Sequence, residues 1–433
     1  LLGGTGFLDI DSFAEETIDV NAGDIAQSDL RNRNRIVQEG DRYKYNYEID
    51  ATVAGGFAQA QFKYRAIDFY IAAQGSQTSY QRDGLFENGY FPGERSFGKS
   101  EKLDFTDFGA KGGLTYKITG RHLIDFNSAY MTKAPGIRNS FSNARQNNDV
   151  VIGVDSEKIQ SVDLSYIYRS PIIKARITGF YTGFEDATEI GFFFTQSFQG
   201  QGFNNDAAFV QEVTTGIEKR HLGGEFGIEA QVTPTIKLKA AGSLGQYIYN
   251  NNPNIYYTST DFEGPKTFGD GTTKLKNLHL SGGPEQAYQL GFEYRDPDFW
   301  WVGATTNYFS NGYVNISKLR RTDAFTTDTD GLPFNDFDET IARGLLQQEQ
   351  FDDYVLVNIV GGKSWKINDY FVGFFATINN VFNQEFKTGG FENSRYSDYR
   401  KLVEESNRDT PIFGSRYFFG NGTTYYVNAY FRF

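Results

Sequence analysis

The sequence predicts an all-β fold, an antiparallel transmembrane β-barrel with short periplasmic turns and long extracellular loops. Three observations indicate it: apolar and polar residues alternate with a period of two, aromatic residues and glycine are abundant, and tight connections between strands alternate with long ones. The chain of 433 residues contains 41 Phe, 28 Tyr and 47 Gly. No apolar run is long enough for a transmembrane helix, and a mean hydropathy of −0.50 is too polar for a helical membrane protein.

The alternation is clearest in the last strand of the chain. One face carries Tyr425, Val427, Ala429, Phe431 and Phe433, and the other carries Tyr426, Asn428, Tyr430 and Arg432. The stretches that begin at Ile236 and at Trp300 repeat the pattern. A strand with one apolar and one polar side fits a soluble β-sandwich and a membrane barrel equally well, so the loop lengths have to decide between them.

Strand and loop lengths favour the membrane barrel. The predicted strands span residues 43–64, 68–82, 103–117, 122–133, 157–169, 173–185, 219–232, 235–249, 285–296, 298–313, 351–366, 369–383 and 423–433. Most exceed the roughly 9–11 residues that a barrel strand needs to cross the hydrocarbon. Tight turns alternate with connections of roughly 20 to 40 residues, and this difference between the two ends is typical of outer-membrane barrels.

The strand count sets the expected domain organisation. About 13 strands are predicted, whereas a closed antiparallel barrel needs an even number. The last strand returns toward the periplasm and so does the first, which predicts an extracellular segment at residues 1–42 and a barrel portion at 43–433. Two explanations of the odd count stay open: further strands lie upstream of this sequence, or a weak strand within residues 10–37 completes the ring.

Composition excludes several kinds of functional site. The chain has no Cys, which rules out disulfides, zinc–thiolate sites, iron–sulfur clusters and cysteine catalysis. A net charge of −12 argues against nucleic acid as a partner. The three histidines are His122, His221 and His279, and none is paired by sequence with a nucleophile and an orienting carboxylate. No enzyme activity, metal or cofactor is expected.

Residues 323–339 form an acidic stretch that invites comparison with a calcium-binding loop. It holds Asp323, Asp328, Asp330, Asp336, Asp338 and Glu339. When Gly331 is aligned with the invariant glycine of an EF-hand, Thr326 takes the first ligand position and Phe337 replaces the bidentate glutamate. The stretch is therefore interpreted as a solvated surface loop. A calcium site of another type, or a divalent bridge to lipopolysaccharide phosphates, stays open.

Two segments near the end of the chain resemble the TonB-dependent outer-membrane receptors. Residues 374–383, Phe-Phe-Ala-Thr-Ile-Asn-Asn-Val-Phe-Asn, are similar to the penultimate strand of that family, which ends in Asn-Leu-Phe or a related triplet. Residues 422–433 resemble its closing strand, with apolar residues at every second position before the terminal Phe. The resemblance implies that Phe431 and Phe433 belong to the signal read by the barrel-assembly machinery.

Residues 130–145 resemble the large receptors of the Bacteroidota phylum, in which a carboxypeptidase-regulatory-like domain precedes the plug. The resemblance implies that this chain is the C-terminal part of a barrel of about 22 strands with a plug inside it. The plug and the TonB box ahead of it are absent from this sequence. The implied location is the bacterial outer membrane, with lipid and lipopolysaccharide around the barrel. The TonB complex would act through the absent N-terminal region.

The polar strand faces supply candidate lumen residues. Five basic residues are predicted to point inward near the periplasmic end: Lys174, Arg176, Lys237, Lys239 and Arg432. Because the resemblance implies that a plug fills this space, they are expected to contact its polar backbone and carboxylates. A water-filled lumen is the alternative.

Aromatic side chains are dense in the predicted extracellular loops. The candidate contacts are Phe192, Phe193, Tyr256, Tyr257, Tyr396 and Tyr399. Exposed rings at this density are typical of surfaces that bind sugars, peptides or partner proteins. The alternative is that the loops pack on one another as a lid.

Two functional hypotheses follow from these observations. The first is an outer-membrane receptor and transporter that imports a siderophore, an oligosaccharide or a peptide through a plugged barrel energised by TonB. The second is a receptor-like barrel that serves as a structural subunit of an outer-membrane assembly or export complex. In that case a surface lipoprotein or other subunits would bind its loops. A TonB box upstream distinguishes the two, because only a transporter needs it.

Overall fold

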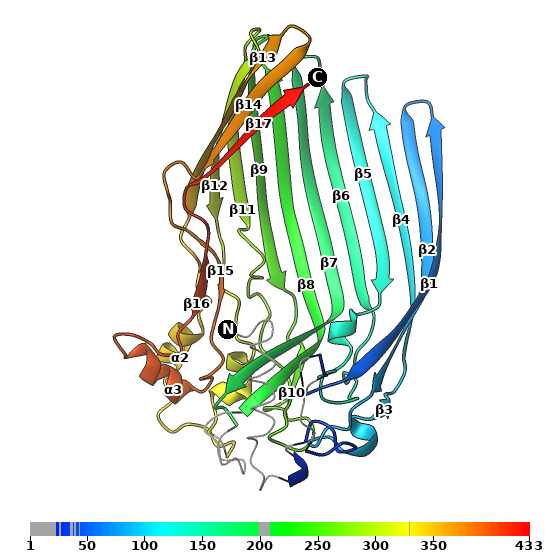
Figure 1. The fold of residues 1–433 in the computed structure, drawn as a ribbon, viewed down its shortest axis with the longest axis vertical. Helices are drawn as coiled ribbons and strands as arrows, with labels where there is room; N and C mark the ends of the chain where they lie inside the picture. The colour runs from blue at the N-terminus through cyan, green and yellow to red at the C-terminus, as the bar shows by residue number, and fades with distance from the viewer. Residues whose placement is uncertain are drawn as a thin grey trace.

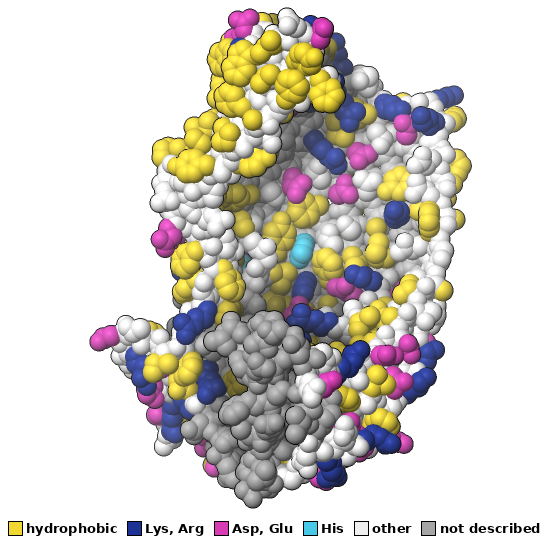
Figure 2. All heavy atoms as spheres, in the orientation of Figure 1, with side chains coloured by type: hydrophobic (Ala, Val, Ile, Leu, Met, Phe, Trp, Pro, Cys, Tyr) yellow, Lys and Arg dark blue, Asp and Glu magenta, His cyan; other side chains and the backbone are white. Residues whose placement is uncertain are grey.

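The computed structural model describes residues 23–25, 27–34, 38, 40–42, 44–198, 208–328 and 330–433. Its main feature is a curved antiparallel sheet of 15 strands around a hollow (Figure 1, Figure 2). Two short strands, β3 (Gly98–Lys99) and β10 (Asn254–Thr258), pair with β2 and β8. The others follow chain order: β1 (Tyr47–Tyr64), β2 (Ile67–Gly84), β4 (Leu103–Lys117), β5 (His122–Lys133), β6 (Glu157–Arg169), β7 (Ile173–Thr195), β8 (Ala208–Gln231), β9 (Ile236–Tyr249), β11 (Gln286–Arg295), β12 (Trp300–Ser310), β13 (Tyr354–Ile367), β14 (Tyr370–Asn379) and β17 (Thr424–Arg432).

The structure confirms the predicted fold class and contains a strand at every predicted range. Bounds agree within a few residues except in β7 and β8, which are 23 and 24 residues long. These two strands continue beyond a bulge between Phe184 and Glu189 as a paired arm. Phe192 and Phe193, predicted as loop residues, therefore lie in a strand, because the arm keeps its backbone hydrogen bonds as far as Thr195. The strand considered within residues 10–37 falls largely outside the described residues.

The two ends of the sheet differ as predicted. Tight turns join β1 to β2, β4 to β5, β6 to β7, β8 to β9, β11 to β12 and β13 to β14, and they lie at the upper end in Figure 1. Arg65, Phe299 and Asn368 turn the chain there with positive φ values of 53°, 64° and 55°. This left-handed backbone is the one that tight hairpin turns require. The long connections gather at the lower end.

Side chains sort by polarity onto the two faces of the sheet. Directly paired residues share a face, and the pairs Leu238–Phe292 and Ala240–Leu290 place apolar residues on the outer face. Leu290 is 67% exposed although it lies in the middle of the sheet. Figure 2 looks into the hollow side, where Lys, Arg, Asp and Glu side chains line the wall. This is the apolar-out, polar-in pattern of a membrane barrel.

Exposed aromatic rings collect near the tight turns. The rings of Tyr294 and Trp300 lie 4.9 Å apart between centroids, and those of Tyr370 and Phe431 lie 5.4 Å apart. Figure 2 shows a hydrophobic cluster over this end of the sheet. Aromatic girdles at the membrane interface are typical of outer-membrane barrels, so the cluster fits one interface between hydrocarbon and water.

The buried apolar core lies at the loop end of the sheet, where the long loops pack on one another and on the ends of the strands. One cluster joins Phe198, Val210, Ile255, Tyr257 and Leu319 from four separate segments. The loops also form small elements that the sequence analysis did not predict: β15 (Lys387–Phe391), β16 (Arg416–Phe419), α2 (Glu339–Leu346), α3 (Tyr399–Ser406) and the 3₁₀ helices η2 (Gly93–Arg95), η3 (Ile137–Asn139), η4 (Leu319–Arg321) and η5 (Asp323–Phe325). Each is too short to show a periodic signal and depends on tertiary contacts.

Local capping explains where α2 begins. The Oδ1 atom of Asp338 accepts hydrogen bonds from the backbone N–H groups of Thr340 at 2.8 Å and Ile341 at 3.0 Å. A carboxylate at this position satisfies the free N–H groups of the first turn. No helix in the described ranges is long and apolar enough to span a membrane.

Gly223 of β8 is a position where a side chain does not fit. A Cβ atom there would lie 2.6 Å from the carbonyl oxygen of Leu244 and 2.7 Å from the Phe180 ring. We expect Gly223→Ala to lower the free energy of unfolding by roughly 1–3 kcal/mol, seen as a lower urea midpoint of the folded barrel. Gly227→Ala is the matched control, because no atom lies within 4 Å of a Cβ there. Equal midpoints for the two variants would contradict the packing shown.

Candidate functional site

The inner wall near the tight turns carries a band of charged side chains. The strand registers place all five predicted lumen residues on this face: Lys174, Arg176, Lys237, Lys239 and Arg432. Neighbouring strands contribute the carboxylates of Glu229 and Glu293 to the same band. These two residues were not predicted from the sequence. Their positions in the period-two alternation could have predicted that both carboxylates face the lumen.

Ion pairs between adjacent strands fix the positions of several charged side chains in this band. The Glu229 carboxylate lies 3.8 Å from Lys174 Nζ and 3.3 Å from Lys237 Nζ. Glu293 lies 2.9 Å from Lys239 Nζ. Such partly exposed pairs stabilise a fold weakly, by about 1 kcal/mol or less. Their main effect is to fix long side chains along the lumen wall.

The two arginines of the set lack such partners. Arg176 donates to Ser165 Oγ at 2.9 Å and to Thr178 Oγ1 at 3.1 Å. Within the described residues, no carboxylate lies at ion-pair distance from Arg176 or from Arg432. Both guanidinium groups are thus open to an acidic group in the lumen, and contact with a plug stays a prediction.

At the opposite end, residues 317–322 fasten the loops together, and we call them the hub segment. Lys318 Nζ lies 2.7 Å from Glu189 of β7 and 3.3 Å from Thr214 Oγ1 of β8, with 11% of its side chain exposed. Burial would lower the pKa of Lys318, but the carboxylates of Glu189 and Glu212 raise it above its usual value. The ammonium therefore stays charged and ties the loop to the arm.

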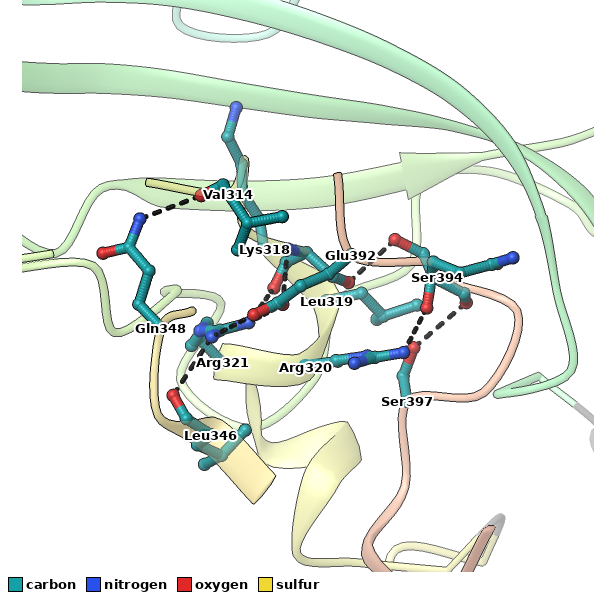
Figure 3. A network of polar contacts seen from close by, with 12 residues as sticks. Val314, Lys318, Leu319, Arg320, Arg321, Leu346, Gln348, Glu392, Ser394 and Ser397 are labelled. Carbon is teal, nitrogen blue, oxygen red and sulfur yellow. Dashed lines mark hydrogen bonds and ion pairs between the residues drawn. The ribbon is translucent and has the colours of Figure 1, made fainter. Parts of the chain in front are cut away.

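Arg321 of the hub segment and Glu392 form a buried ion pair (Figure 3). Arg321 Nη2 lies 2.8 Å from Glu392 Oε1, and Nη1 contacts the other carboxylate oxygen. Glu392 also accepts the backbone N–H of Ser317 at 2.9 Å, and Arg321 donates to the carbonyl of Leu346 at 3.1 Å. The side chains of the pair are 4% and 6% exposed. This pair joins the β12–β13 loop to the β14–β17 loop.

The neighbouring residues of the hub segment reach further partners. Arg320 Nε donates to the carbonyl of Tyr396 at 3.2 Å, and its Nη2 donates to the carbonyl of Asn393. Leu319, between the two charged neighbours, is fully buried in the apolar cluster around Tyr257. Lys318 thus binds the arm, Leu319 packs in the apolar cluster, and Arg320 and Arg321 both bind the β14–β17 loop, so the hub segment joins these parts into one packed cap.

Most of the predicted loop aromatics lie inside this cap. Five of the six are buried or partly buried: Tyr256, Tyr257, Tyr396, Tyr399 and Phe193. Tyr257 is 0% exposed, its hydroxyl donates to Glu212 at 3.3 Å, and burial raises its pKa well above the usual value. Phe192 is 41% exposed. The buried rings pack loop against loop, so ligand contact by these residues stays a prediction.

The acidic stretch 323–339 has local partners. Asp336 lies 2.8 Å from Arg400 Nε, and Asp328 Oδ1 accepts the N–H groups of Asp330 at 3.0 Å and Leu332 at 2.9 Å. Across the described ranges, no three His, Cys, Asp or Glu side chains are arranged to hold a metal ion.

The three histidines lie at separate places on the wall and loops. His122 Nδ1 is 2.6 Å from Tyr166 Oη. His279 stacks on Tyr313, and its Nδ1 lies 2.8 Å from Glu285. His221 packs between the rings of Phe184 and Tyr247.

Sequence reasoning missed the hub segment. Its local signal was the run Lys318-Leu319-Arg320-Arg321, which places three basic residues directly before an acidic stretch. Nothing in the sequence pairs this run with Glu189 or Glu392, which lie 129 and 71 positions away.

Comparison with known proteins identifies the fold. No family model matches the chain, and neither does any curated protein sequence. The ferric citrate transporter FecA in its unliganded form is similar over 92% of this chain and 47% of its own, at 11% identity and a TM-score of 0.55. The siderophore receptor PiuA of Acinetobacter baumannii is similar over 88% of this chain and 43% of its own, at 12% identity and a TM-score of 0.54. The ferric-catecholate import receptor Fiu of E. coli K12 is similar over 89% of this chain and 45% of its own, at 14% identity and a TM-score of 0.51.

These similarities define the class of fold. The antiparallel sheet of this chain has the fold of the barrel walls in these solved structures. It spans about half the length of the solved structures it matches. At 11–14% identity the likeness concerns the fold alone.

Removing the charge of Glu392 should loosen the cap. We expect Glu392→Gln to lower the free energy of local opening in the β12–β13 and β14–β17 loops by roughly 3–5 kcal/mol, because Arg321 would remain buried without a counter-ion. Hydrogen exchange of the backbone amides measures this. Glu339→Gln is the control, since its pair with Arg343 is 74% and 78% exposed. Unchanged loop protection in Glu392→Gln would contradict a fastening role.

Proposed function

We propose that the chain is the C-terminal part of the barrel of a TonB-dependent outer-membrane receptor that imports a nutrient ligand. The observation that carries the proposal is the sheet itself. It is apolar outside and polar inside, with tight turns at one end and a packed loop cap at the other, and it matches transport receptors over most of its length. The sequence motifs at 130–145, 374–383 and 422–433 support the same family.

The proposed location is the outer membrane of a bacterium of the Bacteroidota type. The tight turns face the periplasm and the loop cap faces outward, where lipid and lipopolysaccharide surround the wall. Phe431 and Phe433, which are 60% and 94% exposed, would be free for the barrel-assembly machinery to read.

The open edges of the sheet support a larger barrel. Among the described strands, β1 and β17 each pair on one side only, and Phe57 of β1 and Val427 of β17 are 84% and 68% exposed. An unpaired backbone group in hydrocarbon costs several kcal/mol. In this proposal, further strands of the receptor close the barrel between β17 and β1, a plug fills its lumen, and TonB pulls on that plug from the periplasm.

The ligand class is open between a siderophore, an oligosaccharide and a peptide. The named cargoes of the similar structures, ferric citrate and ferric catecholates, support the siderophore. The packed cap supports a second candidate, a structural subunit of an outer-membrane assembly or export complex. Such a barrel would need stable loops and a permanent partner, such as a surface lipoprotein, and no TonB box.

An uptake experiment separates the two functions. Cells that carry the full-length receptor are given ferric citrate, a ferric catecholate, an oligosaccharide or an oligopeptide, each radiolabelled. We expect uptake of one of them to fall to background when either the receptor gene or TonB is deleted. Uptake that is indifferent to both deletions, together with stable co-purification of other outer-membrane subunits, would favour the structural role.

The basic lumen band gives a test of plug contact. We expect Lys237→Gln combined with Lys239→Gln to weaken retention of the plug, because both ammonium groups lie on the inner wall beside Glu229 and Glu293. Proteolysis of the plug in the full-length receptor, or the force that extracts it, measures the change. Lys276→Gln in an exposed loop is the control. Identical retention in all three proteins would remove the basis for plug contact.

A further inference from the structure

A pocket of about 250 Å³ opens on the inner wall at the loop end of the sheet. It lies where β5 ends, β6 begins and the bulge interrupts β7. The strand registers place its Lys133, Glu157 and Lys219 on the same face as Arg176. These strands occupy the middle of the sheet, away from the open edges of β1 and β17 (Figure 1). The pocket therefore faces the hollow and lies away from the gap that further strands would close.

Most of the pocket lining is polar. Four carboxylates and two ammonium groups contribute to it: Asp155, Glu157, Asp186, Glu189, Lys133 and Lys219. The apolar side chains of the lining are small, those of Ala134, Pro135 and Ala187, and no aromatic ring borders the pocket in the described part of the chain. A ligand here would thus bind through hydrogen bonds, without burying a large apolar group.

The two carboxylates at the bulge already have cationic partners. Glu189 lies 2.6 Å from Lys219 Nζ and 2.7 Å from Lys318 Nζ of the hub segment. Asp186 lies 2.6 Å from Lys158 Nζ. The bulge therefore offers charged groups that are fixed in place and paired, and their remaining lone pairs and protons can still bind a neutral ligand.

The other charged residues of the lining complete a neutral balance. Lys133 and Glu157 are directly paired in register on adjacent strands, and Asp155 precedes β6. When Lys158 and Lys318 are counted with the carboxylates they bind, four ammonium groups stand against four carboxylates. A charged ligand would gain little net attraction here and would lose its hydration. A hydroxyl group, in contrast, can donate to a carboxylate and accept from an ammonium or amide group.

Two uncharged residues add further hydrogen-bonding capacity. Thr188 lines the pocket and is 7% exposed, and within the described ranges its hydroxyl has no hydrogen-bond partner. Asn139 of η3 brings an amide that can both donate and accept. Together with the charged groups, they form a lining that suits a ligand rich in hydroxyl groups.

We infer that this pocket binds one uncharged, hydroxyl-rich unit, a single residue of a neutral oligosaccharide. Sites for whole small molecules occupy roughly 300–1,000 Å³, so a pocket of about 250 Å³ would take one sugar residue of a longer ligand. Because the pocket faces the hollow and not the lipid, the sugar would enter from the mouth of the barrel. The inference rests on the proposed import function for the fate of the ligand, and among the open ligand classes it names the oligosaccharide.

The probe is an array of immobilised oligosaccharides that carry neutral, acidic or amino sugars, incubated with purified full-length receptor in detergent. We expect the receptor to bind glycans of the neutral series. Calorimetry then gives its affinity for the neutral glycan that binds best. This affinity should change less than about twofold between about 0.05 and 0.5 M salt, because salt does not screen the contacts of an uncharged ligand.

A variant that fills the pocket tests the location of the site. We expect Gly136→Phe to weaken binding of that glycan at least about tenfold, because the new ring would occupy the space of the sugar. Gly136 lines the pocket with an ordinary φ of −64°, and no atom lies within 4 Å of a Cβ there, so the variant should fold. Gly282→Phe, in another loop with equally open space, is the matched control.

A second variant tests the polar contacts. We expect Glu157→Ala to weaken binding roughly tenfold, the loss expected for one hydrogen bond to a charged group. Glu101→Ala removes an exposed carboxylate elsewhere and is the control. In the unmodified receptor, the bound glycan should also slow hydrogen exchange in the hub segment, because Glu189 lines the pocket and holds Lys318.

Three results would overturn the inference: no neutral glycan is bound, Gly136→Phe binds as tightly as the unmodified receptor, or the control variants lose as much affinity as the pocket variants. Failure of the import function gives a different pattern. Glycan binding without TonB-dependent uptake would keep the site and remove import. TonB-dependent uptake of another ligand, with no glycan bound, would remove the site alone.

Discussion

Backbone pairing is the constraint on which the rest of this structure depends. In hydrocarbon, an N–H or C=O group has no water to bind, so a spanning strand must pair along its whole length. Between β1 and β17 the described strands of the wall pair with both neighbours, whereas the outer edges of β1 and β17 stay open. This antiparallel ladder dictates a side-chain period of two. Apolar residues then face outward and charged residues face the hollow. The lumen band and the exposed outer leucines are consequences of that one arrangement.

The described hydrophobic clusters lie at the loop end of the wall, where the loop cap packs against the ends of the strands. Ion pairs between residues far apart in the sequence hold the loops of the cap together. Lys318 meets Glu189, and Arg321 meets Glu392, in surroundings where an unpaired charge would be strongly unfavourable. Such pairs give geometric specificity, because only one arrangement of the loops satisfies them.

The same fastening shapes the outer surface. The hub segment holds the carbonyl of Leu346, and with it the end of α2. The two ends of the molecule carry different charged groups. The lumen band lies near the tight turns, and its Arg176 and Arg432 have no ion-pair partner among the described carboxylates; the acidic stretch 323–339 lies on the cap. In the proposed receptor, the lumen band would face the interior of the barrel and the acidic stretch would face the medium.

The sequence by itself determined the strands, their faces and the difference between the two ends. Period-two alternation and turn chemistry are local properties, which is why β4, β5 and β6 were predicted to the residue. The inward position of Lys237 and Lys239 followed from the same alternation.

The tertiary structure alone decided the cap. No local sequence feature marks Lys318 as the partner of Glu189 or Arg321 as the partner of Glu392. The helices α2 and α3 are too short to give a periodic pattern in the sequence. Whether Tyr257 and Tyr399 face solvent or fill a core depends on which loops meet. That choice is made by burial of apolar area and pairing of charge across the fold, and these interactions have no period in the sequence to reveal them.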